Sequence, residues 1–264
     1  MKILIAYDGS ADAERAIAGL QRAGLPTEAE AIIISVIEPW HNAPEFDCTL
    51  QALPMLQQAF PKWEAHAELR RGTPSREVLL FAQEWKPDLI VLGSHGLSRR
   101  PDLAIGSVSQ QILTAAATSV RVVKGEVRDS DYPVRLLLAV DGSPDSEHGV
   151  QSLLERTWPE STKVWIVTAV SGGYSMEEIE SERQAAMELH ERIGKKLQQA
   201  GLSYTSIIGM GDPRSVILSE AEAWEVDCIV IGARSMTPYQ RTLLGSVSAA
   251  VAARSRCTVE VSRL

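Results

Sequence analysis

The chain repeats itself at about half its length. The run Lys2–Ser10 (KILIAYDGS) returns as Arg135–Ser143 (RLLLAVDGS), a shift of 133 residues (135 − 2). Further on, Asp88–Gly93 (DLIVLG) returns as Asp227–Gly232 (DCIVIG), a shift of 139 residues (227 − 88). This period is the size of a whole small domain, roughly 100–150 residues, whereas solenoid units repeat every 20–50 residues or so. The sequence therefore predicts a tandem duplication of one domain.

Each copy alternates short apolar runs with helical patterns. In the first copy, Ala31–Ile37 is a β-branched run typical of a strand buried on both faces. Ser75–Trp85 carries apolar side chains at the three- and four-residue spacings of a helix. Strands that alternate with helices predict a parallel sheet with helices on both faces. We expect two tandem open five-stranded α/β domains, over residues 1–125 and 134–264, with a polar linker between them.

The two copies differ most after their second strand. Met176–Ala200 reads as one long charged helix. The equivalent segment of the first copy, Glu38–Pro61, contains four prolines, so we expect only short helical pieces there. Trp63–Arg70 alternates weakly and is predicted to be a strand nearer the edge of the sheet.

Charge and composition exclude several classes of function. A net charge of −8 gives no basic field for a nucleic-acid backbone. No apolar run approaches the roughly 20 residues of a membrane-spanning helix. The three cysteines are far apart and form no C-x-x-C pair, which favours reduced thiols in a cytosolic protein.

One loop of the first copy has the glycine pattern of an anion site. After the strand Leu89–Leu92 come Gly93-Ser-His-Gly96, nine residues, and Gly106-Ser107 at the start of a predicted helix. Ligands of open α/β sheets bind beyond the carboxyl ends of the strands, and a helix N-terminus presents free N–H groups to an anion. Gly93 and Gly96 permit positive φ and a close approach of the backbone to a ligand. We interpret the loop as a polyphosphate site; the alternative is that its glycines only form turns.

These residues resemble a known family. The spacing G-x2-G-x9-G-S, a first strand that ends in Asp8 and a second that ends in Val36-Ile-Glu-Pro39 resemble the universal stress protein family. The resemblance covers nearly the whole chain, in two copies. It implies a five-stranded parallel α/β fold, and ATP binding where the glycine pattern is complete.

The resemblance also assigns roles to eleven positions of the first domain. It places three at the end of the first strand, one with its backbone toward the adenine edge, two along the ribose and five at the phosphates. In that order they are Ala6, Tyr7 and Asp8; Val36; Leu92 and Gly93; His95, Gly96, Gly106, Ser107 and Val108.

Three kinds of side chain in or near this set have two interpretations each. Asp8 can bind Mg²⁺ or a ribose hydroxyl, or it can cap the first helix. His95 is interpreted as a loop hydrogen-bonding residue in preference to a catalytic base, because no nucleophile or second base lies near it in the sequence. Arg99 and Arg100 can neutralise phosphate or simply be solvated.

The second domain keeps only part of the pattern. Serine replaces Gly96, and its Cβ occupies space where the backbone should approach a phosphate. We therefore expect ATP mainly in the first domain, with weak binding at the second site left open. The equivalent positions are Ala139, Asp141, Ala169, Gly232, Ser235, Gly245, Ser246 and Val247.

The leading hypothesis is a cytosolic stress-response protein that binds ATP, with Asp8 as the candidate Mg²⁺ ligand, and acts as a regulatory or sensor module. One alternative is a nucleotide-free interaction protein that acts through domain pairing. Another is a very slow ATPase, although no Walker lysine or evident general base is present.

The last strand of each domain is the predicted pairing surface. The resemblance implies pairing through this strand, Val120–Val123 in the first domain and Thr258–Val261 in the second. An unpaired edge strand exposes N–H and C=O groups, and pairing satisfies them. We expect the two domains to pair within one chain, and a homodimer of the whole chain stays open.

Overall fold

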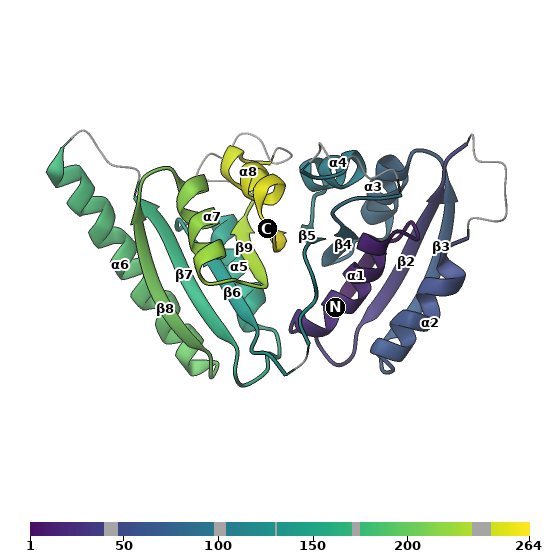
Figure 1. Cartoon of the computed structure of the whole chain (residues 1–264), viewed down its shortest axis with the longest axis horizontal. Helices are drawn as coiled ribbons and strands as arrows, with labels where there is room; N and C mark the ends of the chain where they lie inside the picture. Colours follow the sequence, from purple (N-terminus) through teal and green to yellow (C-terminus); the bar gives the residue numbers. More distant parts are fainter. Residues whose placement is uncertain (40–46, 98–103, 130, 171–174, 234–243) are drawn as a thin grey trace. The chain divides into compact units, whose positions relative to one another are not determined.

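The chain folds as two compact units, Met1–Val127 and Arg128–Leu264. A computed structural model describes residues 1–39, 47–97, 104–129, 131–170, 175–233 and 244–264. Figure 1 traces the chain from the N-terminus of the first unit to the C-terminus of the second. Within the described residues, no helix is both long enough and apolar enough to cross a membrane.

The first unit is a parallel sheet of five strands in the order β3-β2-β1-β4-β5. Helices α1 and α2 pack together on one side of this sheet, and α3 and α4 pack together on the other (Figure 1). The elements in chain order are β1 (Lys2–Ala6), α1 (Ala11–Gly19), the 3₁₀ turn η1 (Leu20–Arg22), β2 (Glu30–Ile37), α2 (Thr49–Ala59), β3 (Glu64–Arg71), α3 (Pro74–Trp85), β4 (Leu89–Gly93), α4 (Ser107–Ala115) and β5 (Ser119–Val123).

The second unit repeats this architecture, with strand order β8-β7-β6-β9-β10 and all neighbours parallel. Its elements are β6 (Arg135–Ala139), α5 (Pro144–Leu154), β7 (Lys163–Val170), α6 (Met176–Gln199), β8 (Ser203–Met210), α7 (Pro213–Ala223), β9 (Cys228–Gly232), α8 (Ser246–Arg254) and β10 (Thr258–Ser262). The predicted fold class, two tandem five-stranded parallel α/β sheets, is confirmed.

Strand order follows from which runs are apolar on both faces. All five residues of β4 are buried, and β1 lies between β4 and β2, with Ala6 beside both Ile34 and Leu92. The outer strand β3 alternates exposed and half-buried side chains, as its weak pattern predicted. From β1 the chain continues through α1 to β2, and from β4 it continues through α4 to β5, so the sheet is extended in opposite directions from this central pair. The loops after β1 and β4 therefore lead to helices on opposite faces of the sheet. Such a switch point forms a crevice at the carboxyl ends of the strands.

One element was predicted wrongly. The segment expected to hold only short helical pieces contains α2, a helix of 11 residues with Pro54 inside it. Its Ala52 and Leu56 are fully buried in the core of the first unit. Tertiary packing of an apolar helix face supplies most of the stability of a short helix, and here it offsets the hydrogen bond that the proline lacks.

Candidate functional site

A cavity of about 700 Å³ lies at the carboxyl ends of the central strands of the first unit. This volume is within the range of small-molecule pockets, about 300–1,000 Å³. The structure brings together on its wall all eleven positions that the sequence singled out in the first domain. They are Ala6, Tyr7, Asp8, Val36, Leu92, Gly93, His95, Gly96, Gly106, Ser107 and Val108. The loop positions Arg99 and Arg100 lie outside the described residues.

The N-terminus of α4 forms one side of this cavity. Gly106 is the N-cap residue, and no side chain caps the helix. Ser107, Val108 and Ser109 of the first turn line the cavity. The first N–H groups of a helix have no partner within it and carry a partial positive charge. This wall therefore suits an anionic group such as a phosphate.

The glycines of the loop are needed for close packing, and the expectation of positive φ was wrong. Neither Gly93 nor Gly96 has a positive φ. A Cβ on Gly93 would lie 2.7 Å from the backbone carbon of Asp12, and a Cβ on Gly96 would lie 2.4 Å from Asp8 Oδ2. Both distances are far below van der Waals contact. Glycine thus lets the loop approach the start of α1.

Asp8 holds the loop and does not cap the first helix. Ser10 is the N-cap of α1, and its Oγ accepts a hydrogen bond from the Ala13 N–H at 3.2 Å. Asp8 Oδ1 accepts from the Ser10 N–H at 3.0 Å, and Asp8 Oδ2 accepts from the Leu97 N–H at 3.2 Å. The helix-capping interpretation of Asp8 is therefore wrong. Binding of Mg²⁺ by Asp8 stays a prediction, and the described residues contain no cluster of three or more metal-ligating side chains.

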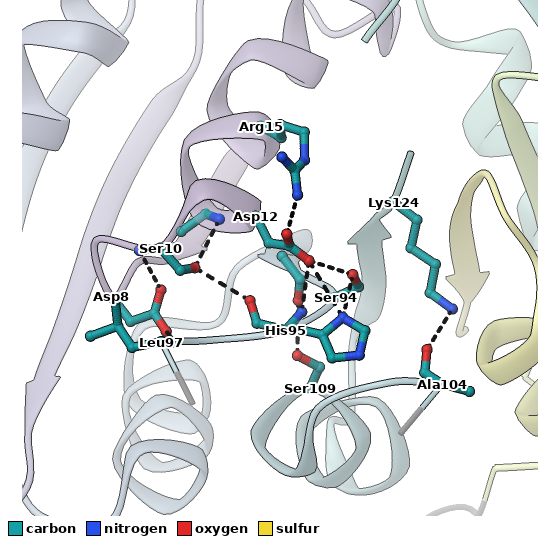
Figure 2. A network of polar contacts seen from close by, with 12 residues as sticks. Asp8, Ser10, Asp12, Arg15, Ser94, His95, Leu97, Ala104, Ser109 and Lys124 are labelled. Atoms are coloured by element: carbon teal, nitrogen blue, oxygen red, sulfur yellow. Dashed lines mark hydrogen bonds and ion pairs between the residues drawn. The ribbon is translucent and has the colours of Figure 1, made fainter. Parts of the chain in front are cut away.

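Asp12 is a residue that the sequence analysis missed. It lies in the first turn of α1 and is 7% exposed. Asp12 Oδ2 accepts from the Ser94 hydroxyl at 2.6 Å and from the His95 N–H at 3.0 Å (Figure 2). A signal was present, because the pattern D-x-S-x-D that ends in Asp12 recurs in the second half as Asp141-Gly-Ser-Pro-Asp145.

The carboxyl of Asp12 stays ionised although it is buried. Burial acts to raise the pKa of Asp12, but three partners outweigh it. The hydrogen bond from Ser94, the charge of Arg15 and the His95 N–H together hold the pKa below its ordinary value of 3.8. Arg15 forms an ion pair with Asp12 one helical turn along α1.

His95 acts as a hydrogen-bonding residue of the loop. Its ring Nδ1 lies 3.0 Å from Ser94 Oγ, and its backbone carbonyl accepts from the Ser10 hydroxyl at 3.3 Å. Ser94 gives its only hydroxyl proton to Asp12, so Ser94 Oγ must accept from His95 Nδ1–H. The Nδ1 atom of His95 is therefore protonated.

Tyr7 lines the cavity and also belongs to the hydrophobic core of the first unit. It is 3% exposed, and its hydroxyl has no hydrogen-bond partner among the described residues. Burial is the main reason that the pKa of Tyr7 is raised, with a further contribution from the Glu14 carboxylate. Burial likewise raises the pKa of the Cys48 thiol, which lies in the same cavity wall. A buried hydroxyl without a partner is costly.

Comparison with known proteins decides the family. The Universal stress protein family matches residues 1–124 and again residues 134–263. The chain belongs to the universal stress protein family.

Relatives span both the tandem and the single-domain form. A universal stress protein of Mycolicibacterium smegmatis is 25% identical over 289 residues, with 99% of this chain and 96% of that protein covered. A universal stress protein of Thermus aquaticus is 31% identical over 135 residues, which are 46% of this chain and 97% of that protein. The crystal structure of a universal stress protein from Archaeoglobus fulgidus shares the fold, with a TM-score of 0.75 at 20% identity, and the match covers 99% of this chain and 96% of that one.

The second universal stress protein repeat keeps the framework of the site but changes the loop. Ser143 caps α5, and Asp141 Oδ1 accepts from the Ser143 N–H at 2.9 Å, as at the equivalent positions of the first unit. Gly245 is the uncapped N-cap of α8. A Cβ on Gly232 would lie 2.7 Å from the Ser146 backbone nitrogen, so this glycine too permits close packing.

The remaining candidate positions of the second repeat that the structure describes lie at the ends of strands and at the start of a helix, as in the first repeat. Ala139 ends β6 and Ala169 lies near the end of β7, while Ser246 and Val247 begin α8. Ser235, the residue that replaces Gly96, lies outside the described residues. Ala233 stands where the first repeat has Ser94 (94 + 139 = 233), so it provides no hydroxyl for Asp145. Instead, Asp145 Oδ1 accepts from the Leu264 N–H at 3.2 Å.

Proposed function

We propose that this protein binds an adenine nucleotide, ATP, in the cavity of the first unit and acts in the stress response as a nucleotide-responsive regulatory module rather than as an enzyme. The observation that carries the proposal is the convergence of the glycine loop, the uncapped N-terminus of α4 and the end of β2 on one cavity. We place the protein in the cytoplasm because its three cysteines are free thiols.

The cavity residues suit the parts of a nucleotide. The uncapped first turn of α4 offers backbone N–H groups to phosphates. The end of β2 at Val36 offers main-chain groups to the base edge, and the apolar side chains of Val78 and Leu92 line the same cavity. Asp8 can contribute one carboxylate to a Mg²⁺ ion that takes its other ligands from phosphate oxygens and water. The magnesium ion would neutralise phosphate charge beside Asp8.

Binding without rapid turnover follows from the polar groups of the cavity. Hydrolysis needs a group that orients and deprotonates a water molecule. The His95 Nδ1–H is directed to Ser94, and the carboxylates of Asp8 and Asp12 accept hydrogen bonds from the loop. We propose that these groups hold the loop and that the remaining acceptor of His95, its Nε2 atom, does not position a water molecule for the reaction.

Two measurements test the proposal. Mass analysis of nucleotide released from the purified, denatured protein should identify an adenine nucleotide. Calorimetric titration of the nucleotide-free protein with ATP should give close to one tight site per chain, because the second repeat has Ser235 in place of Gly96. Two equal tight sites, or no binding, would contradict the proposal.

We also propose that the two units pair through their last strands. The central residues of β5 and β10 are Arg121 and Glu260, which are equivalent in the duplication (260 − 121 = 139) and opposite in charge. Glu260 forms a buried ion pair with Arg156 in the second unit. Antiparallel pairing of these strands about their centres would set Arg121 opposite this pair, whereas pairing of two copies of β5 would set two arginines opposite each other, which is unfavourable.

Charge reversal tests this pairing. Arg121→Glu should increase the radius of gyration measured by small-angle X-ray scattering, whereas Arg76→Glu, at an exposed position of α3, should leave it unchanged. Scattering curves that are the same for wild type and Arg121→Glu would contradict the role of Arg121 in pairing.

A further inference from the structure

We propose that Asp12 is a positioning residue for the nucleotide loop, and that with Asp8 and Ser10 it forms a clamp on the loop backbone. The inference rests on the nucleotide binding proposed above for the first unit. It assigns to the start of α1 the task of holding the loop in the conformation that receives the phosphates.

The clamp contacts successive backbone groups of the loop. The His95 N–H donates to Asp12 Oδ2 at 3.0 Å, the His95 carbonyl accepts from Ser10 Oγ at 3.3 Å, and the Leu97 N–H donates to Asp8 Oδ2 at 3.2 Å (Figure 2). The three side chains come from alternate positions of one short segment. The loop glycines carry no side chains, so the loop depends on such contacts from its neighbours.

Asp12 also connects α1 to the start of α4. The Ser94 hydroxyl donates to Asp12 Oδ2 at 2.6 Å, and the Ser94 carbonyl accepts from the Gly106 N–H at 2.8 Å. Gly106 is the N-cap of α4, where the phosphates are proposed to bind. The residue that Asp12 holds through its hydroxyl is therefore the residue that contacts this N-cap through its carbonyl. The second repeat keeps the equivalent backbone bond, from the Gly245 N–H to the Ala233 carbonyl, without a serine hydroxyl. Loss of Asp12 would therefore release the loop at Ser94 and His95 and leave this backbone bond in place.

The same carboxylate sets the state of His95. Because Ser94 gives its proton to Asp12, it can only accept from His95 Nδ1–H. Asp12 Oδ2 lies 3.5 Å from the same Nδ1 atom. The ring is therefore held in one orientation with its Nδ1 protonated, in the way that outer partners orient the ligands of a metal site.

The second repeat shows that the serine contact of this aspartate is not a requirement of the fold. It keeps the equivalent carboxylate, Asp145, but Ala233 removes the serine partner. Asp145 accepts from the Leu264 N–H instead. The sheet and helices around Asp145 are nonetheless the same as those around Asp12. The connection from this carboxylate through a serine hydroxyl to the loop is thus specific to the first unit.

The experiment compares Asp12→Ala and Ser94→Ala with the matched control Asp145→Ala. Each protein is titrated with ATP and with adenosine. A loop that visits its binding conformation about a tenth of the time binds about tenfold more weakly. We expect that loss for ATP in Asp12→Ala and Ser94→Ala, while adenosine, which lacks phosphates, changes less than twofold. Asp12→Asn, which keeps one oxygen acceptor, should fall between wild type and Asp12→Ala, and Asp145→Ala should match wild type.

Hydrogen exchange of the nucleotide-free proteins provides a second readout. Amides of residues 93–97 should exchange faster in Asp12→Ala than in wild type or Asp145→Ala, with protection in β1 and β4 retained. Equal loss of ATP and adenosine binding, unchanged ATP binding, or unchanged exchange in 93–97 would each overturn the inference. A wild-type protein that binds no ATP would refute the proposed function, and the exchange comparison would still decide whether Asp12 holds the loop.

Discussion

A buried histidine of the second unit makes its stability depend on pH. His190 lies on α6 and is 2% exposed. Its Nε2 is 2.8 Å from Thr168 Oγ1 and its Nδ1 is 2.6 Å from Ser206 Oγ. Thr168 donates its proton to the Val140 carbonyl at 2.6 Å, so it must accept from His190 Nε2–H, and Ser206 then donates to Nδ1. These hydrogen bonds are all satisfied by the neutral imidazole.

The size of the effect follows from the pKa. Burial lowers the pKa of His190 from 6.5 to about 4. Between these two values the unfolded chain binds a proton at this position and the folded protein does not. Stability therefore rises with pH across this window and is lost as the pH falls from 6.5 toward 4. At pH 5 the loss relative to pH 8 is about 2 kcal/mol, taking 1.36 kcal/mol per pKa unit.

The assay compares His190→Gln with wild type at pH 8 and pH 5. The free energy of unfolding of the second unit is measured from the urea dependence of hydrogen exchange in β7. His190→Gln should lose about 2 kcal/mol less than wild type between the two pH values. His66→Gln, at a β3 side chain that is 57% exposed, is the control and should behave as wild type.

Direct titration by NMR provides the test of the premise. The imidazole signal that is absent in His190→Gln should titrate near pH 4. A signal that titrates above pH 6, or a His190→Gln variant with the same pH dependence of stability as wild type, would refute the reasoning.

Three further predictions concern the proposed nucleotide site. Gly96→Val should abolish ATP binding in calorimetric titration while circular dichroism stays unchanged, because the new Cβ would lie 2.4 Å from Asp8 Oδ2 and displace the loop; normal binding would show that the loop is wrongly assigned. Ser235→Gly should raise ATP affinity at the second site, and an unchanged binding isotherm would show that this serine does not limit the site. Phosphate release from ATP should be slow or undetectable; several turnovers per second, lost on substitution of Asp8 or His95, would make the protein an enzyme.

The fold could be predicted from the sequence because its determinants are local and repeated. Continuous apolar runs such as Ala31–Ile37 and Leu89–Leu92 are long enough only for strands, and the helical patterns between them require parallel connections. The duplication allowed each strand and helix to be predicted from two different sequence segments. The helix α2 was missed because Pro54 is a strong local signal, whereas the buried packing of Ala52 and Leu56 that stabilises the helix is a property of the whole unit.

The positions of the candidate site could be predicted from the sequence, but the hydrogen bonds between them could not. Spacing located the glycines, yet their purpose depends on how near Asp8 and Asp12 come in space, 89 and 83 residues from their loop partners. For the same reason, Asp8 was considered a helix cap when Ser10, two residues later, performs that task. Hydrogen bonds between residues so far apart in the sequence have no characteristic spacing from which they could be predicted. The recurring D-x-S-x-D pattern was the one local sequence signal for the three residues of the clamp.

The two units differ at one pair of equivalent polar positions. Thr168, the equivalent of the cavity-lining Ser35 (35 + 133 = 168), is bound to His190 in the second unit. The second unit thus uses at this position a polar network whose charge changes with pH, while the first unit leaves the equivalent serine on the wall of a cavity. The second unit also has Ala233 in place of Ser94, whose hydroxyl donates to Asp12 in the first unit. His190→Gln should therefore change the pH dependence of stability without changing the affinity for ATP.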